Sequence, residues 1–164
     1  MDLQKIECII LDCDGILTDG KLNIDHTGDK MFKSFHTRDV RAIRELVSRG
    51  FEVYIVSADD WPGGAKFANK VGAFWHDCRE KSKVWEWLGR RPFIGIGDDA
   101  WDKQMLEAAI IKFCPCDADE SIRSIEGIHI LDSRGGYGVM AEVLRVLSCD
   151  DQTIIFSLSG TTEP

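Results

Sequence analysis

Three short apolar segments of this sequence each stop at a cluster of polar residues. A short apolar run bounded by turn residues is typical of a buried strand. Helical patterns separate the runs, and this alternation predicts an α/β domain with a parallel sheet covered on both faces. Parallel strands bring their carboxyl ends to one edge of a sheet, where ligands bind, so we expect the clusters to meet there. The clusters are Asp12 and Asp14 after residues 9–11, Ser57 after residues 51–56, and Asp98 and Asp99 after residues 93–96.

Asp12 and Asp14 occupy alternate positions at the end of the first apolar run. Alternate residues of an extended chain lie on the same side, so both carboxylates can share one side while Cys13 points away. Two close carboxylates repel each other unless a cation neutralises them. This stretch is therefore a candidate Mg²⁺ site with a spare carboxylate for chemistry. The alternative is a strand that runs into an ordinary Asp/Gly turn.

Turn residues and apolar spacing predict the other elements. Two strand-like segments flank an Asp/Gly turn at residues 25–29, which is the pattern of a β-hairpin beside the two acids. Such a hairpin could form a flap over the site. The hairpin strands are expected at 21–24 and 31–35, further strands at 73–75, 110–113 and 128–131, and helices from 37 until Gly50 and at 64–71, 81–88, 101–109 and 138–147.

The charge balance restricts the possible partners. A net charge of -8 without a basic block disfavours nucleic acids and anionic membranes, so an anionic substrate needs a local cationic pocket. No positive region followed by an apolar stretch opens the sequence, and no run is long enough to cross a bilayer, so we expect a cytoplasmic protein. The six cysteines are then expected to be reduced, with Cys114 and Cys116 as small side chains at a strand end rather than a metal or redox pair.

The length of 164 residues fits one domain, expected at residues 1–150. The tail at 151–164 is polar apart from residues 154–156, and we expect it to be loosely ordered unless a partner captures it.

A cation and a further acid can join the same pocket. Asp102 lies about one helical turn after Asp98, so it can face the site and hold a metal-bound water or a lysine. Lys81 begins a predicted helix and is the candidate cation. Lys83 competes for this role, and the alternative for either one is a solvated lysine at a helix start.

Taken together, these motifs resemble the four-motif set of the haloacid dehalogenase-like (HAD) phosphatases. More narrowly, they resemble the small branch without a cap domain that includes the phosphatases of 3-deoxy-manno-octulosonate 8-phosphate and of nonulosonate 9-phosphates. The resemblance covers residues 6–147 and implies a HAD-like Rossmannoid three-layer sandwich with a parallel central sheet, a β-hairpin flap at about 18–36 and no large cap domain. The matching segments are residues 12–20, residues 35–39, Ser57, Lys81, residues 97–102 and residues 135–138.

The resemblance implies a role for each motif residue. Asp12 would be the nucleophile that forms an aspartyl-phosphate, and Asp14 would act as general acid and then general base. Ser57 and Lys81 would hold the phosphoryl oxygens. The implied Mg²⁺ ligands are the Asp12 carboxylate, the backbone carbonyl of Asp14 and the Asp98 carboxylate. Asp102 and Asp99 would contact these ligands rather than the ion.

The resemblance also implies the substrate, a 2-keto-3-deoxy sugar-acid phosphate of lipopolysaccharide or sialic acid-like biosynthesis. Arg38 and Arg44 are natural partners for its carboxylate, because a guanidinium can bind a carboxylate through two hydrogen bonds. The alternative is that both arginines lie on a solvated helix face. The residues expected to contact the sugar acid are His36, Thr37, Arg38, Asp39, Arg44, Asp59 and Lys70.

Several positions depart from the octulosonate branch. Ala58-Asp59 stands where those enzymes carry Gly-Arg, and Phe67 stands where they carry a further Arg. An acid at position 59 and Lys70 are similar to the nonulosonate members, so the choice between the two substrates stays open. Ala141 replaces a family Arg, and the link from Lys81 to Asp98 is shorter than usual.

The resemblance further implies a homotetramer in which hairpins pack together and a neighbour's tail closes the pocket. A chain without a cap needs some lid to exclude water. Two other functions remain as alternatives: a non-catalytic oligomerisation or regulatory module associated with a sugar-acid cytidylyltransferase, and a response-regulator-like receiver. The full set of acids argues against the module, and the hairpin argues against the receiver.

Overall fold

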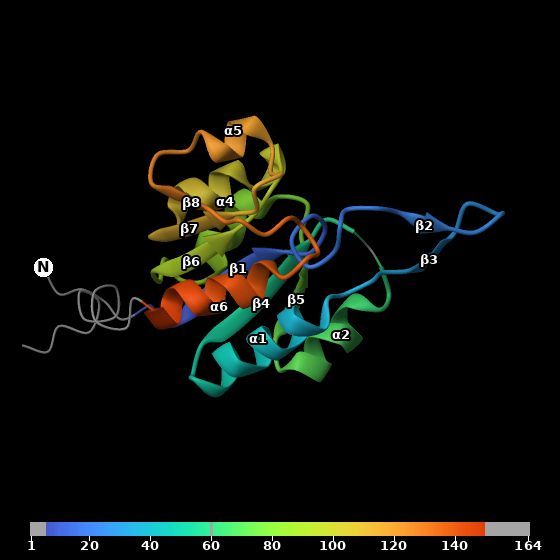
Figure 1. Ribbon diagram of the computed structural model, residues 1–164, viewed down its shortest axis with the longest axis horizontal. Coiled ribbons are helices and arrows are strands. Elements are labelled where there is room, and N and C mark those ends of the chain that lie inside the picture. The colour runs from blue at the N-terminus through green and yellow to red at the C-terminus, as the bar shows by residue number, and fades with distance from the viewer. Residues whose placement is uncertain (1–5, 60, 150–164) are drawn as a thin grey trace, which may run out of the picture.

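A parallel sheet of six strands forms the centre of the structure, a computed structural model that describes residues 6–59 and 61–149 (Figure 1). The strand order is β5-β4-β1-β6-β7-β8, and every pair in it is parallel. The strands are β1 (Cys8–Asp12), β4 (Glu52–Ser57), β5 (Phe74–Asp77), β6 (Phe93–Ile96), β7 (Ile111–Cys114) and β8 (Ile128–Ile130).

Helices cover both faces of this sheet. One face carries α1 (Thr37–Ser48), α2 (Gly64–Val71) and α6 (Val139–Cys149). The other carries α3 (Val84–Trp87), α4 (Lys103–Ala108) and α5 (Glu120–Arg123), together with the 3-10 turns η1 (Lys81–Lys83) and η2 (Ala100–Asp102). Helices on both faces of a parallel sheet confirm the expected three-layer α/β architecture. The described residues contain no separate cap domain.

The composition of β1 explains its central place. Every residue of this strand is buried. Ile9 and Leu11 pack into the core beneath α1 and α6, whereas Cys8 and Ile10 pack into the core on the other face. A strand that is covered on both sides must be apolar at consecutive positions, which is why the sequence shows an unbroken run rather than an alternation.

The register of the sheet places the polar strand ends at one level. Asp12 pairs with Val56 of β4, and Leu11 pairs with Ile96 of β6. Ser57 and Asp98 therefore follow their strands at the same carboxyl edge as Asp12, as the apolar runs predicted.

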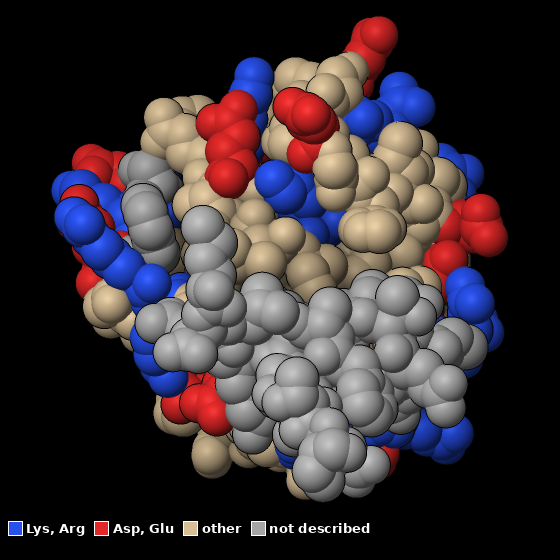
Figure 2. Space-filling view, turned by 90° about the vertical axis from the view of Figure 1, so that its left-hand side faces the viewer, with Lys and Arg blue, Asp and Glu red and all other residues tan. Residues whose placement is uncertain are grey.

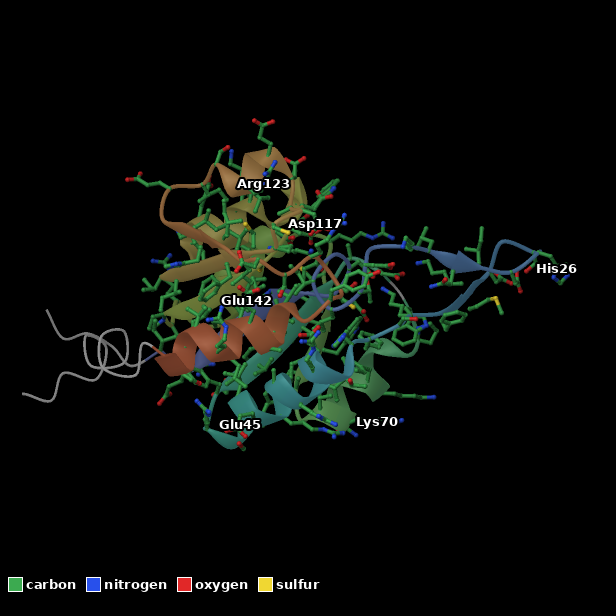
Figure 3. All side chains as sticks on the ribbon, viewed as in Figure 1. His26, Glu45, Lys70, Asp117, Arg123 and Glu142 are labelled. Atoms are coloured by element: carbon green, nitrogen blue, oxygen red, sulfur yellow. The ribbon has the colours of Figure 1, made fainter. Side chains whose placement is uncertain are left out.

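A β-hairpin leaves the body beside this edge and projects away from it (Figure 1). It consists of β2 (Asn23–Ile24) and β3 (Lys30–Phe32), which are shorter than expected, and His26 lies at its tip (Figure 3). Four large apolar side chains on it are 53–67% exposed: Leu22, Ile24, Met31 and Phe32.

The second half of the chain differs from the expectation in two places. The helix expected at 81–88 is divided into η1 and α3, and the short helix α5 was not expected. The tail at 151–164, including residues 154–156, lies outside the described residues. Cys8, Cys13 and Cys114 are buried free thiols, and Cys78 and Cys116 are partly buried free thiols.

The end of the molecule opposite the hairpin carries basic and acidic side chains of mixed sign (Figure 2). Within the part of the chain that the structure describes, no helix combines the length and hydropathy required to span a bilayer.

Candidate active site

Three carboxylates gather at the carboxyl edge of the sheet. Asp12 ends β1, while Asp98 and Asp102 lie in the loop and 3-10 turn that follow β6. One oxygen of each carboxylate lies within 4.8 Å of the other two. Asp12 and Asp102 are buried and Asp98 is partly buried. The acids that the sequence predicted to converge therefore do so.

Lys81 places its ammonium between two of these acids. Its Nζ lies 2.8 Å from Oδ1 of Asp12 and 2.7 Å from Oδ1 of Asp102, and its side chain is 4% exposed. Burial alone lowers the pKa of Lys81, but attraction by Asp12 and Asp102 outweighs this effect and raises the pKa above its ordinary value. The competing Lys83 is 56% exposed and pairs with Glu80. The structure thus places Lys81, and not Lys83, in the pocket.

Asp102 holds the backbone of the acidic loop. Its Oδ2 accepts hydrogen bonds from the backbone N–H groups of Asp98, at 3.0 Å, and Asp99, at 3.3 Å, while its Oδ1 accepts one from Lys81. Both oxygens are thus engaged. By contrast, Oδ1 of Asp98 is buried and has no hydrogen-bond partner within residues 6–59 and 61–149. Asp98 is therefore better placed than Asp102 to contact a cation directly.

Burial and mutual repulsion raise the pKa values of two acids. The pKa of Asp12 is raised to about 7, first by burial and then by the charge of Asp102. Burial, followed by the charges of Asp12 and Asp102, raises the pKa of Asp98 to about 8. Excess negative charge and a buried oxygen without a partner are features that suit a hard divalent cation with oxygen ligands, such as Mg²⁺. The residues present therefore fit the expected metal.

Asp14 and Ser57 belong to a neighbouring network. The Asp14 carboxylate accepts a hydrogen bond from the Thr18 hydroxyl at 3.0 Å and pairs with Lys33 at 2.5 Å. Its side chain is 35% exposed, so it can meet a ligand that arrives from solvent. Ser57 is buried at the end of β4, and its Oγ accepts the backbone N–H of Asp59 at 3.1 Å.

Lys33 is a site residue that the sequence reasoning missed. It follows β3 directly, and its Nζ lies 2.5 Å from Asp14 and 2.7 Å from Asp59. Its side chain is 7% exposed. Lys30 also pairs with Asp59. The only signal in the sequence is a basic residue inside a largely apolar strand segment, and that signal does not say which way the side chain turns.

The residues expected to bind the sugar acid fall into separate places. At the start of α1, His36 accepts the backbone N–H of Arg38 through Nδ1 at 3.2 Å, and both Thr37 and Arg38 are exposed. The Arg44 guanidinium instead donates to the backbone oxygen of Lys70, at 3.1 Å. Lys70 lies on α2 at the lower border of the molecule (Figure 3).

The contact between Arg44 and Lys70 lies at the C-terminal end of α2. Among the contacts of the described residues, the hydrogen bond of the Arg44 guanidinium goes to Lys70 and not to the acids.

Asp39 has an internal role that the sequence did not suggest. It is buried, and its two carboxylate oxygens accept the backbone N–H groups of Gly138 and Ala141, each at 3.1 Å. Burial raises the pKa of Asp39, while these hydrogen bonds oppose the rise. Asp39 thus joins α1 to the start of α6. Ala141 takes part through its backbone, so its short side chain does not weaken the join.

Phe67, at the position where an Arg was expected by resemblance, stacks on Phe35 with ring centroids 3.8 Å apart. Trp61 also packs against the ring of Phe35, with centroids 6.0 Å apart. At the base of the hairpin, Phe35 therefore contacts two aromatic rings, and the position expected to carry a cation holds one of them.

Comparisons with known proteins agree with this geometry. No protein-family model matches the chain. The chain is 30% identical over 149 residues to the 3-deoxy-D-manno-octulosonate 8-phosphate phosphatase KdsC of Haemophilus influenzae, and the match covers 86% of this chain and 82% of that protein.

Solved structures show the same fold. The cobalt-bound deoxy-D-mannose-octulosonate 8-phosphate phosphatase of Haemophilus influenzae superposes with a TM-score of 0.78 at 27% identity, with 97% of each chain covered. The 3-deoxy-D-manno-octulosonate 8-phosphate phosphatase of Moraxella catarrhalis, in complex with magnesium, phosphate and KDO, superposes with a TM-score of 0.80 at 21% identity, over 98% of this chain and 96% of that one.

Proposed function

Since this chain belongs to the HAD phosphatase family that includes the 3-deoxy-D-manno-octulosonate 8-phosphate phosphatases, and is therefore a phosphoric monoester hydrolase, we propose that it hydrolyses a 2-keto-3-deoxy sugar-acid phosphate. The observation that carries this proposal is the cluster formed by the buried Asp12, Lys81 and Asp102 and the partly buried Asp98. A scaffold has no need to bury these charges together, since each buried charge is costly. The alternative of a non-catalytic module is accordingly not favoured.

In the proposed reaction, a carboxylate oxygen of Asp12 forms a bond to phosphorus while the bond from phosphorus to the sugar oxygen breaks. Asp14 gives a proton to that departing oxygen. Water then attacks the aspartyl-phosphate, Asp14 takes the water proton, and phosphate leaves with Asp12 restored. The difference in exposure supports this division, because Asp12 is buried whereas the side chain of Asp14 is 35% exposed.

The other polar groups would hold the phosphoryl oxygens. The Lys81 ammonium already lies 2.8 Å from Asp12 and would face the negative charge of the phosphoryl group. The buried Ser57 hydroxyl lies at the same strand edge and would add a donor. Fixed donors of this kind stabilise the transition state without reorganisation.

A magnesium ion would be held by the carboxylates of Asp12 and Asp98 and by the backbone carbonyl of Asp14, with Asp102 keeping the loop in place. When bound, it supplies positive charge that allows a carboxylate to approach an anionic phosphate. The excess charge at Asp12 and Asp98 and the unpartnered oxygen of Asp98 support this assignment.

We take octulosonate 8-phosphate as the first substrate to test, because the relatives reported above act on it. Nonulosonate 9-phosphates are the second candidate. Asp59 and Phe67 favour them, since an acid and an aromatic ring stand where the octulosonate branch carries cations. A site of this kind would act in lipopolysaccharide or sialic acid-like sugar biosynthesis, in the cytoplasm.

The proposal includes a homotetramer assembled through the hairpins. Four large apolar side chains exposed on one short hairpin would be costly in water, and burial against other hairpins would remove them from it.

The test is phosphate release from octulosonate 8-phosphate and from nonulosonate 9-phosphates, with and without Mg²⁺. We expect turnover that requires Mg²⁺ and that Asp12→Asn abolishes. Absence of phosphate release from every sugar-acid phosphate in the presence of Mg²⁺ would reject the proposal.

A further inference from the structure

Two lysines with largely covered side chains serve this site, and each one bridges two acids from different segments of the chain. Lys81 lies 2.8 Å from Asp12 and 2.7 Å from Asp102. Lys33 lies 2.5 Å from Asp14 and 2.7 Å from Asp59. The two lysine side chains are 4% and 7% exposed. Buried lysines are rare unless they are paired, so both positions need an explanation.

The partners of the two lysines indicate different tasks. Lys81 contacts the residue proposed to attack phosphorus, so its ammonium lies at the phosphoryl end of the substrate. Lys33 contacts Asp14, the residue proposed to protonate the leaving oxygen. A leaving-group oxygen that is hydrogen-bonded to Asp14 would lie within about 5 to 7 Å of the Lys33 ammonium, from the sum of two hydrogen-bond lengths and the width of a carboxylate. Lys33 therefore lies within reach of the sugar rather than of phosphorus.

The charges around Lys33 balance, because the ammonium groups of Lys33 and Lys30 face the carboxylates of Asp14 and Asp59. An ammonium has three N–H donors and the two carboxylates of Lys33 engage two of them, so the third can serve a hydroxyl-rich ligand. Burial lowers the pKa of Lys33, but its hydrogen bonds to Asp14 and Asp59 outweigh burial and raise the pKa above its ordinary value. The ammonium thus stays charged at neutral pH. The ring of Trp61, with its centroid 5.8 Å from Nζ, limits its movement on one side.

We propose, on the premise of the function given above, that Lys33 is a specificity-determining residue whose ammonium donates a hydrogen bond to an oxygen of the leaving sugar acid. Asp59, which follows the neighbouring strand β4, holds the ammonium in place. Because Lys33 follows β3 directly, the base of the hairpin becomes part of substrate recognition. Lys33 forms no bond to phosphorus and takes no part in proton transfer.

The test compares two substrates that share the phosphoryl group and differ in the leaving group. For Lys33→Met, kcat/KM for 3-deoxy-D-manno-octulosonate 8-phosphate is expected to fall about 10- to 100-fold, the range for one charge-assisted hydrogen bond. The kcat/KM for n-butyl phosphate, whose alkoxide leaving group needs the same proton from Asp14 but offers no further oxygen, is expected to fall much less. Lys33→Arg should recover part of the loss for the sugar acid, because it keeps a charged donor.

Lys21→Met is the matched control. Lys21 lies on the outgoing arm of the same hairpin, is 75% exposed and pairs with Asp19, so the ratio between the two substrates should not change. If Lys33→Met does not fold, as judged by circular dichroism, Lys33→Gln replaces it with the same expected change in ratio.

An equal loss for both substrates would overturn the proposal, because Lys33 would then act only on the fold or on Asp14. No loss for either substrate would also overturn it. Both outcomes leave the proposed function standing as long as the unmodified enzyme releases phosphate from the sugar acid. If the unmodified enzyme releases none from any sugar-acid phosphate, the proposed function fails and this proposal fails with it.

Discussion

Gly15 lies directly against the carboxylate of Asp98. A Cβ atom added at Gly15 would stand 2.0 Å from Oδ2 of Asp98, and the backbone of Gly15 has a φ of +87°. The turn after β1 therefore depends on a residue without a side chain for two separate reasons, its conformation and its closeness to a proposed metal ligand.

We predict that Gly15→Ala destroys the site, whereas Gly28→Ala does not. Gly28, at the tip of the hairpin, has nearly the same φ of +89° but no atom within 4 Å of an added Cβ. Both variants carry the backbone strain of a side chain at positive φ, about 1–2 kcal/mol. Only Gly15→Ala also displaces Asp98, so we expect it to lose Mg²⁺-dependent turnover while Gly28→Ala keeps it. Similar activity in the two variants would contradict the close contact.

Asp12→Asn should abolish turnover while the fold persists. Loss of a nucleophile typically costs at least about 10³-fold in kcat. The substitution also removes a buried charge that raises the pKa of Asp98, so the free energy of unfolding without metal at pH 8 should stay equal or increase. Phosphate release and urea unfolding measure the two effects. Turnover close to that of the unmodified enzyme would exclude Asp12 as the nucleophile.

The stability of the metal-free protein should fall as the pH rises from about 4 to about 8. In this window, folded Asp12 and Asp98, whose pKa values are raised to about 7 and about 8, still hold protons that the unfolded chain has released. The folded state binds more protons, so the slope of unfolding free energy against pH is negative, with about 1.4 kcal/mol per pH unit for each proton. This stabilising contribution is complete below pH 4 and lost above pH 8.

Two comparisons isolate this effect. Asp98→Asn should flatten the slope, because it removes one of the two groups. Glu52, whose pKa is lowered to about 2 chiefly by its hydrogen bond to Arg91, contributes in the opposite direction but only below about pH 4.5. Added Mg²⁺ should stabilise the protein more at pH 8 than at pH 5, since it binds the ionised carboxylates. Thermal unfolding at a series of pH values measures both comparisons, and a flat profile in the unmodified protein would contradict the raised pKa values.

The sequence predicted the parts of this site that follow from strand topology. The apolar runs before Asp12, Ser57 and Asp98 specify parallel buried strands, and parallel strands must end at one edge. Residues at those ends are therefore located without knowledge of any side-chain direction. The burial of Lys81 was expected only as a possibility, and its choice over Lys83 depends on the 3-10 turn at Lys81–Lys83, which has no distinct sequence pattern.

Residues whose role depends on packing between distant segments could not be located in this way. Lys33 and Asp39 lie in segments with the correct local structure, but one turns inward to Asp14 and the other caps α6, which begins 100 residues later in the sequence. Phe67 is similar, because its stacking partner Phe35 belongs to the end of the hairpin. Local periodicity carries no information about such contacts.

Asp39→Ala should destabilise the protein strongly. The change leaves the backbone N–H groups of Gly138 and Ala141 without their acceptor in a buried place, and each such group costs about 1–3 kcal/mol. Asp39→Asn should cost less, because one acceptor oxygen remains. Urea unfolding measures both. A stability equal to that of the unmodified protein, together with a raised KM for the sugar acid, would instead favour the direct substrate contact first expected for this residue.

Phe32→Glu combined with Met31→Glu should separate the assembly into smaller species. These side chains are 53% and 59% exposed on the projecting hairpin, and in the proposed tetramer they lie between hairpins. Charges placed in such an interface repel one another and lose hydration, so association weakens. The isolated chain should keep its fold, because β2 and β3 pair only with each other and not with the central sheet.

Light scattering after size-exclusion chromatography gives the mass of each species, and circular dichroism checks the fold. The same change at His26 and Thr27, in the polar turn at the hairpin tip, provides the control. If the unmodified protein is monomeric, the hairpin surface has another use; if the double variant remains a tetramer, the interface lies elsewhere.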